Sequence, residues 1–133
     1  MIRPATSDDV TPIAAIELAC FASGAWSERL VRAQIAGNRQ VVLVDDELRA
    51  YGSISLVDDV ADLDRLATVP SAQGSGLARS LLERLVDQAR DRGAGRMLLE
   101  VAADNAPAIG LYRSFASDTI STRRRAPRAA RSW

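Results

Sequence analysis

The strongest periodic pattern of apolar residues in the chain starts near residue 77 and predicts an amphipathic helix. Six apolar residues recur there at the i, i+3, i+4 spacing that aligns side chains along one helix face. They are Ala78, Leu81, Leu82, Leu85, Val86 and Ala89. Gly93 follows at the position where a helix of this length needs a left-handed residue to end it. We therefore expect a helix with one buried side that ends before Gly93.

Shorter patterns predict the other elements and their order along the chain. Apolar and β-branched runs predict strands over residues 1–4, 41–44, 48–56, 63–69 and 96–102. Capping residues predict helices that begin at Thr6 or Ser7, at Ser27, and at Asp104 or Asn105. An acidic hairpin turn is expected at Asp45–Glu47, and an acidic connection at residues 57–62. This order predicts an α/β (α+β) fold, with a mixed sheet flanked by helices.

Three single residues carry expectations about packing. Gly52, inside a predicted strand, indicates a bulge or a close approach to the backbone. Cys20, the only cysteine, is expected to be a small core residue, because the chain has no histidine to activate it as a nucleophile. Trp26 either packs or lines a substrate groove, and we favour packing because a tryptophan near a helix cap usually buries most of its ring.

Size and composition describe one ordinary globular domain. The chain has 133 residues, of which 47% are hydrophobic and 26% are charged, and 17 basic residues balance 17 acidic ones. This balance provides no global electrostatic basis for nucleic-acid binding. A single cysteine excludes an intrachain disulfide, and no stretch has the length of a membrane helix or the pattern of a secretory signal. We expect a cytoplasmic protein with no membrane contact.

Charge is distributed unevenly at the C-terminal end of the chain. Every arginine after the last acidic residue, Asp118, lies within residues 123–131. A single domain is therefore predicted over residues 1–122, followed by a basic tail over residues 123–133. We favour a solvated, poorly ordered tail over one that contacts RNA or a ribosomal surface.

A glycine-rich turn precedes the long helix and predicts an anion site. Gly74 and Gly76 lie where the first helical N–H groups have no internal partners and the helix dipole is positive. Glycine lets a phosphate approach the backbone, so we expect a pyrophosphate cradle. The chain has no lysine and no Gly-x-Gly-x-x-Gly, which excludes the nucleotide-hydrolysing loop and the dinucleotide fingerprint.

The turn also matches a known pattern. Gln73-x-x-Gly76-x-Ala78, between a strand and a helix, resembles the acyl-CoA loop of the GNAT acetyltransferases. The resemblance extends to the RimI-type branch through three segments in register: Leu66–Pro70, Leu98–Val101 and Asn105–Tyr112. It implies the GNAT acyl-CoA N-acyltransferase fold and a mixed, mostly antiparallel sheet. It also implies direct transfer from acetyl-CoA to an amine, the N-terminal alanine of a small-subunit ribosomal protein.

The resemblance assigns cofactor contacts to several residues. The backbone of Leu66, Ala67 and Thr68 is expected to bind the pantetheine arm like an added strand, and an amide there to stabilise the oxyanion. The expected pyrophosphate loop consists of Gln73, Gly74, Ser75, Gly76, Leu77, Ala78 and Arg79. Asn105 is expected to contact the cofactor, although a helix cap explains it nearly as well. No metal is expected.

Catalysis needs a base and an acid, and the composition restricts both. Without histidine, the base must be a carboxylate or a water held by one. Glu100 interrupts an apolar run and is either that base or a glutamate on the wet face of a strand; the resemblance favours the base. It also makes Tyr112 the acid for the CoA thiolate, since a phenol with a pKa of about 10 suits a thiol near about 8.5. An amphipathic core position is the other interpretation of Tyr112.

After Tyr112 the chain departs from the RimI-type pattern. The last strand and a tyrosine pair of that branch are absent from residues 113–133. We therefore expect a sheet that lacks its final strand and is uncovered beside the Glu100 strand. Two other functions stay open: acetylation of a small-molecule amine, and a non-catalytic CoA-binding or ribosome-associated module.

Overall fold

The computed structural model describes residues 1–102 and 120–125, with side chains described as far as Leu98. Within these ranges, six strands form one sheet in the order of the sequence. They are β1 (Ile2–Pro4), β2 (Gln40–Asp45), β3 (Ala50–Val57), β4 (Val60–Thr68), β5 (Arg96–Ala102) and β6 (Ile120–Arg125). The first three pairings are antiparallel and the last two are parallel, which confirms the mixed, mostly antiparallel sheet.

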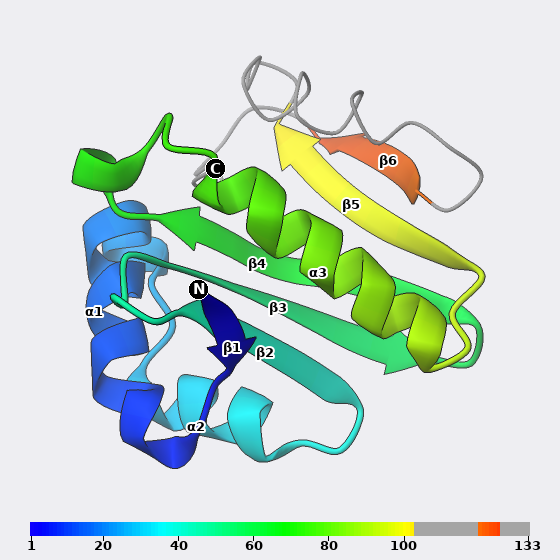
Figure 1. Cartoon of the computed structure of the whole chain (residues 1–133), viewed down its shortest axis with the longest axis horizontal. Helices are drawn as coiled ribbons and strands as arrows, with labels where there is room; N and C mark the ends of the chain where they lie inside the picture. The colour runs from blue at the N-terminus through cyan, green and yellow to red at the C-terminus, as the bar shows by residue number, and fades with distance from the viewer. Residues whose placement is uncertain (103–119, 126–133) are drawn as a thin grey trace.

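Helices cover both faces of the sheet (Figure 1). They are α1 (Val10–Phe21), α2 (Glu28–Ala36) and α3 (Leu77–Asp91), joined by the short 3-10 turns η1 (Ser7–Asp9), η2 (Ala22–Gly24) and η3 (Pro70–Ala72). Alternate residues of β2 point to opposite faces of the sheet. Leu43 packs with α3 on one face, and Val44 packs with α1 and α2 on the other. A strand that is covered on both faces has a continuous run of apolar residues, and β2 has such a run from Val41 to Val44.

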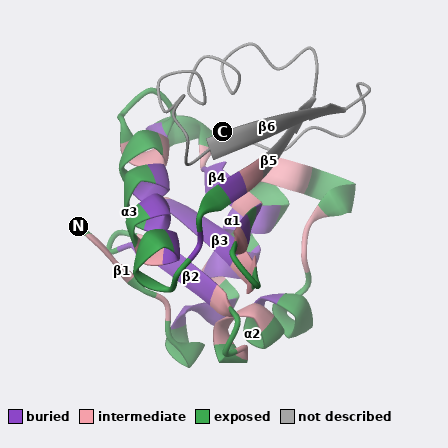
Figure 2. Ribbon diagram, turned by 90° about the vertical axis from the view of Figure 1, so that its right-hand side faces the viewer, coloured by how far each residue is buried: buried purple, intermediate pink, exposed green. Residues whose placement is uncertain are grey.

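The predicted face of α3 is buried against the sheet, as Figure 2 shows. Leu81, Leu82, Leu85, Val86 and Ala89 are all buried. The helix approaches β3 so closely that a Cβ at Gly52 would lie 2.7 Å from Leu85 Cδ1. The register of β3 against β4 also shifts between Ser53 and Ile54. Both features predicted from Gly52, a close approach and a local irregularity, are confirmed.

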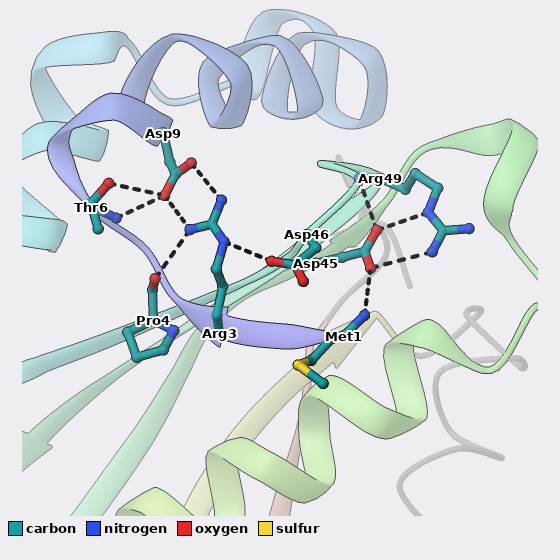
Figure 3. Close-up of polar contacts among 8 residues, drawn as sticks. All are labelled: Met1, Arg3, Pro4, Thr6, Asp9, Asp45, Asp46 and Arg49. Carbon is teal, nitrogen blue, oxygen red and sulfur yellow. Dashed lines mark hydrogen bonds and ion pairs between the residues drawn. The ribbon is translucent and has the colours of Figure 1, made fainter.

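A polar cluster ties the edge strand β1 to its neighbours (Figure 3). Arg3 donates from Nη1 and Nη2 to the two oxygens of Asp9, at 2.7 and 3.0 Å, and from Nε to Asp46 at 2.8 Å. The backbone N–H of Thr6 also donates to Asp9, at 2.8 Å. This arrangement confirms the predicted start of the first helical segment at Thr6 or Ser7.

Asp45 is the first residue of the predicted acidic turn, which the Leu48 N–H closes by donating to Asp45 O at 2.7 Å. It is the last residue of β2 and is fully buried, with Arg49 Nε donating to its Oδ2 at 2.8 Å. The amine of Met1 lies 3.8 Å from its Oδ1. A buried carboxylate persists with such partners, so the predicted turn is confirmed and its first residue is buried.

Acid should weaken this edge of the protein. Hydrogen bonds from Arg3 hold the pKa of Asp9 below its ordinary value against the opposing effect of burial, and Arg49 does the same for Asp45. The folded state therefore binds fewer protons than the unfolded state, and its extra stability is present above about pH 4 and lost as the pH falls further. We expect urea unfolding at pH 7 and pH 3 to show a smaller acid loss for Asp9→Asn than for the wild type. Equal losses would contradict this prediction.

Two boundaries differ from those predicted. Residues 60–62 belong to β4 and not to a connection. In this part of the strand, exposed Asp62 alternates with buried Ala61 and Leu63. The prediction was wrong because a charged residue such as Asp62 is typical of a loop. Arg123–Arg125, assigned to the tail, lie in β6. Because β6 pairs with β5, the expectation of an uncovered strand beside Glu100 is also wrong. Residues 126–133, where the branch has its last strand, lie outside the described residues, so the tail stays a prediction.

Candidate active site

The sheet opens between β4 and β5. These parallel strands pair only at Val60–Asp62 with Arg96–Leu98. β4 continues to Thr68 and β5 to Ala102, and the two diverge toward their C-terminal ends (Figure 1). Among the described strands, residues 63–68 pair with β3 alone. We call this divergence the β4–β5 opening; the carboxyl ends of parallel strands are where ligands usually bind in such sheets.

The backbone of β4 presents polar groups to this opening. The Val69 N–H donates to Arg49 O at 2.9 Å, toward β3. Because backbone groups alternate sides along a strand, those of Thr68 and Leu66 face away from β3, and those of Ala67 face toward it. Of the three residues predicted to bind the pantetheine arm, two therefore have backbone groups directed at the opening.

The glycine-rich loop lies between the end of β4 and α3, and its geometry fits a pyrophosphate. Gly74 and Gly76 have φ of 80° and 88°, in the left-handed region. A Cβ at either position would meet no atom within 4 Å, so the space beside the loop backbone is open. Gly76 is the N-cap of the 15-residue helix α3 and provides no side chain to cap it. The first amides of α3 are thus suited to an anion.

Polar side chains hold this loop to β4. Gln73 Nε2 donates to Thr68 O at 3.1 Å, so this side chain shapes the loop. The hydroxyl of Ser75 donates to Ala72 O. Among the described side chains, the buried Thr68 hydroxyl has no hydrogen-bond partner. An unpaired buried hydroxyl is costly, and it lies at the strand end where a cofactor arm would pass.

The remaining loop residues divide by their side chains. Those of Leu77 and Ala78 pack partly against the core, so only their backbone can serve a ligand. Arg79 is exposed, with Nε 3.5 Å from Glu83 Oε1. This cation lies on the first turn of α3 and can reach solvent beside the loop.

The predicted catalytic residues are not tested by these contacts. The backbone of Glu100 lies in β5, beyond the last pairing with β4, and opposite Arg123 of β6. Its side chain, Tyr112 and Asn105 lie outside the described residues, so their roles stay predictions. Among the side chains that the structure describes, as far as Leu98, no group of acidic or cysteine side chains could hold a metal ion. No helix within residues 1–102 and 120–125 is long and apolar enough to cross a membrane.

A buried polar cluster on the α1 side of β4 was missed by the sequence predictions. Glu17 is fully buried on α1 and accepts from Arg65 Nε at 3.1 Å, from the Trp26 N–H at 2.7 Å and from the Tyr51 hydroxyl. Burial first, and then the Glu17 charge, raise the pKa of Tyr51, which keeps its hydroxyl a donor. The one signal in the sequence was a glutamate within an apolar helix. Trp26 and Cys20 pack against the adjoining core, as predicted.

Comparison with known proteins identifies the family. Residues 12–116 match the model of the acetyltransferase (GNAT) family. The chain belongs to this family. The chain is 38% identical over 102 residues to the ribosomal protein bS18-alanine N-acetyltransferase of Salmonella typhimurium. The aligned region covers 74% of this chain and 68% of that protein. The Escherichia coli enzyme of the same name is 36% identical over the same shares.

Solved structures agree with this assignment. The Escherichia coli ribosomal-protein-S18-alanine N-acetyltransferase superimposes with a TM-score of 0.76 at 34% identity, over 87% of this chain and 76% of that one. The Salmonella typhimurium protein yncA, solved with its cofactor acetyl-CoA, has a TM-score of 0.75 at 27% identity, over 87% and 78% of the two chains. The predicted GNAT fold and the enzyme class, an N-acetyltransferase, are confirmed.

Proposed function

We propose that this GNAT enzyme transfers the acetyl group of acetyl-CoA to the α-amine of a protein N-terminus, an alanine of a small-subunit ribosomal protein. The observation that carries the proposal is the β4–β5 opening beside an uncapped helix N-terminus. The relative at 38% identity carries the matching name. A cytoplasmic location, where ribosomal proteins are made, follows from the proposal. It requires no membrane and no direct contact with nucleic acid.

Binding is divided between two elements of the chain. The amides of Gly74–Gly76 and the first turn of α3 hold the pyrophosphate, where the helix dipole and the left-handed glycines favour an anion. The backbone groups of Leu66 and the N–H of Thr68 pair with the pantetheine arm in the β4–β5 opening, whereas Thr68 O already accepts from Gln73 and Cys20. This anchoring fixes the position of the thioester, the form in which bound acetyl-CoA supplies the acetyl group.

Proton transfer falls to two residues in the proposal. Glu100 takes the proton of the attacking amine, directly or through a water, and Tyr112 gives a proton to the departing sulfur. The only thiol of the chain, Cys20, is committed to Thr68 O at 3.3 Å. The amine therefore attacks the thioester directly, with no acetylated enzyme on the path.

The proposed base suits an α-amine better than a lysine. An α-amino group has a pKa of about 8, against about 10.4 for lysine, so its neutral fraction at pH 7 is greater by roughly two orders of magnitude. A carboxylate is a modest base, and it deprotonates the lysine ammonium ion, which is the weaker acid of the two, with more difficulty. This favours a protein N-terminus as the acceptor.

A small-molecule amine is the second candidate acceptor. The streptothricin acetyltransferase of Streptomyces lavendulae is 35% identical over 82 residues, which is 59% of this chain and 43% of that protein. Comparing kcat/KM for an Ala-Arg peptide and for spermidine separates the two candidates. We expect the peptide to be preferred by at least about tenfold, a difference of about 1.4 kcal/mol in transition-state binding. Preference for spermidine would replace the protein acceptor with a small one.

A further inference from the structure

One buried carboxylate joins three separate segments next to the proposed site. We call Glu17, Tyr51 and Arg65 the Glu17 cluster. Glu17 receives donors from β3 (Tyr51), from β4 (Arg65) and from the connection between α1 and α2, through the N–H of Trp26. Its side chain is 0% exposed and that of Arg65 is 12% exposed. A buried charge persists only when its hydrogen bonds are satisfied, and this one has three.

Arg65 extends this network along the α1–α2 connection. Its Nη2 donates to Gly24 O at 2.8 Å, and its guanidinium carbon lies 4.3 Å from the ring centroid of Phe21 and 4.6 Å from that of Trp26. A planar guanidinium combines such stacking with directed hydrogen bonds, which an ammonium group cannot do. Residues 21–26 therefore contact a single side chain of β4 at three points.

The connection needs this external support. Ala22 has φ 49° and ψ −114°, a conformation that residues with side chains rarely adopt. Such a backbone persists only where surrounding contacts hold it. Ala22, Ser23 and Gly24 are exposed, and the Glu17 cluster contacts this turn through Arg65 at Gly24 O and through Glu17 at the Trp26 N–H.

The supported connection lies beside the β4–β5 opening. Arg65 immediately precedes Leu66, whose backbone faces the opening, and Cys20 at the end of α1 donates to Thr68 O. The half-buried rings of Phe21 and Trp26 thus pack over Arg65 on the α1 face of β4, beside the stretch that we assign to the cofactor arm. In the proposed function this arm carries the thioester, so a wall at this place borders the path of the acceptor to it.

We propose that Glu17 and Arg65 are positioning residues that hold the Ala22–Trp26 connection as a wall of the acceptor site. The proposal rests on the proposed function, since it concerns the acceptor of that reaction. The acetyl-CoA contacts of the proposed function involve the glycine loop and the backbone of β4, and none of them uses the side chains of this wall. Loss of the cluster therefore displaces the acceptor and leaves acetyl-CoA in place. Displacement of a substrate by about 1 Å is enough to cost up to roughly a hundredfold in rate.

The test uses a double variant with a matched control. Glu17→Gln with Arg65→Met removes both charges, so that neither remains buried and unpaired. We expect the KM for an Ala-Arg peptide to rise roughly tenfold or more, with the acetyl-CoA Kd from calorimetry within about twofold of wild type. The control, Asp9→Asn with Arg3→Met, removes an ion pair between buried Asp9 and half-exposed Arg3 at the opposite end of the α1 segment. The control should leave both constants unchanged.

A spectroscopic readout tests the wall without turnover. Trp26 and Trp133 are the only tryptophans, so a Trp133→Phe background isolates Trp26. Loss of the Glu17 cluster should shift its emission to the red and speed proteolysis within residues 21–27, and the control pair should do neither. Tyr51→Phe keeps Arg65 paired with Glu17 and stacked, and should show a smaller effect in the same direction. This variant provides the measurement if the double variant does not fold.

The outcomes separate this inference from the proposed function. If wild type acetylates a different amine, the proposed function fails and the KM of that amine becomes the readout for the cluster. A selective rise in acceptor KM supports the inference with either substrate. An acceptor KM equal to that of the control variant, or a matching loss of acetyl-CoA affinity, overturns it.

Discussion

We expect Glu100→Gln to lower kcat for acetyl transfer by roughly 10² to 10⁴-fold and to leave the acetyl-CoA Kd within about twofold. Glutamine keeps the size of the side chain and removes its capacity to take a proton. The chain has no histidine, so a nearby group cannot replace the carboxylate as an imidazole would. The backbone of Glu100 lies in β5 past the last pairing with β4, on the edge that borders the β4–β5 opening.

Rates measured from pH 6 to 9 on the variant and on Glu47→Gln provide the control. Glu47 lies on the β2–β3 turn with a side chain 68% exposed, and its substitution should leave kcat unchanged. Turnover of Glu100→Gln that equals wild type at every pH would remove Glu100 from the mechanism. A loss shared by both variants would mean that the effect is not specific to the base.

Replacing Gly76 by valine weakens acetyl-CoA binding by roughly ten- to a hundredfold. A side chain there would enter the open space beside the loop, where the pyrophosphate is expected, and would remove one or more hydrogen bonds to charged oxygens. Calorimetric titration with acetyl-CoA measures the change. Valine at φ 88° also costs about 1–2 kcal/mol of folding stability, because the left-handed region crowds its Cβ.

Gly93→Val is the matched control for this strain. Gly93 has φ 91°, its added Cβ also meets no atom within 4 Å, and it lies just past the opposite end of α3. Both variants should lose similar stability in urea, whereas Gly76→Val alone should lose acetyl-CoA affinity. Equal Kd values for the two variants would contradict the assignment of the loop as the pyrophosphate cradle.

Local patterns were sufficient for the elements whose signals are contiguous. The buried side of α3, the left-handed Gly93 and the close approach at Gly52 each depend on a few neighbouring residues, and all three were predicted. The start of β4 was misjudged because Asp62 gives a half-exposed strand the charge of a loop. Asp45 lies in the predicted turn, but its burial was not predicted, since it depends on the ion pair with Arg49.

The site required tertiary information. The β4–β5 opening depends on where parallel pairing stops, and no residue type marks that position in the sequence. The Glu17 cluster is assembled across 34 residues to Tyr51 and 48 residues to Arg65. Only a lone glutamate in an apolar helix indicated it. The glycine loop was predicted because its residues are contiguous and their backbone conformation follows from their type.

The most direct test of the central claim is the release of CoA from acetyl-CoA with two peptides. One begins with Ala-Arg and has a free N-terminus; the other has the same sequence with that amine blocked. The proposed function predicts CoA release with the free peptide alone, and a single added acetyl group on its α-amine by mass spectrometry. No release with either peptide, or equal release with both, would contradict N-terminal α-amine acetylation by this enzyme.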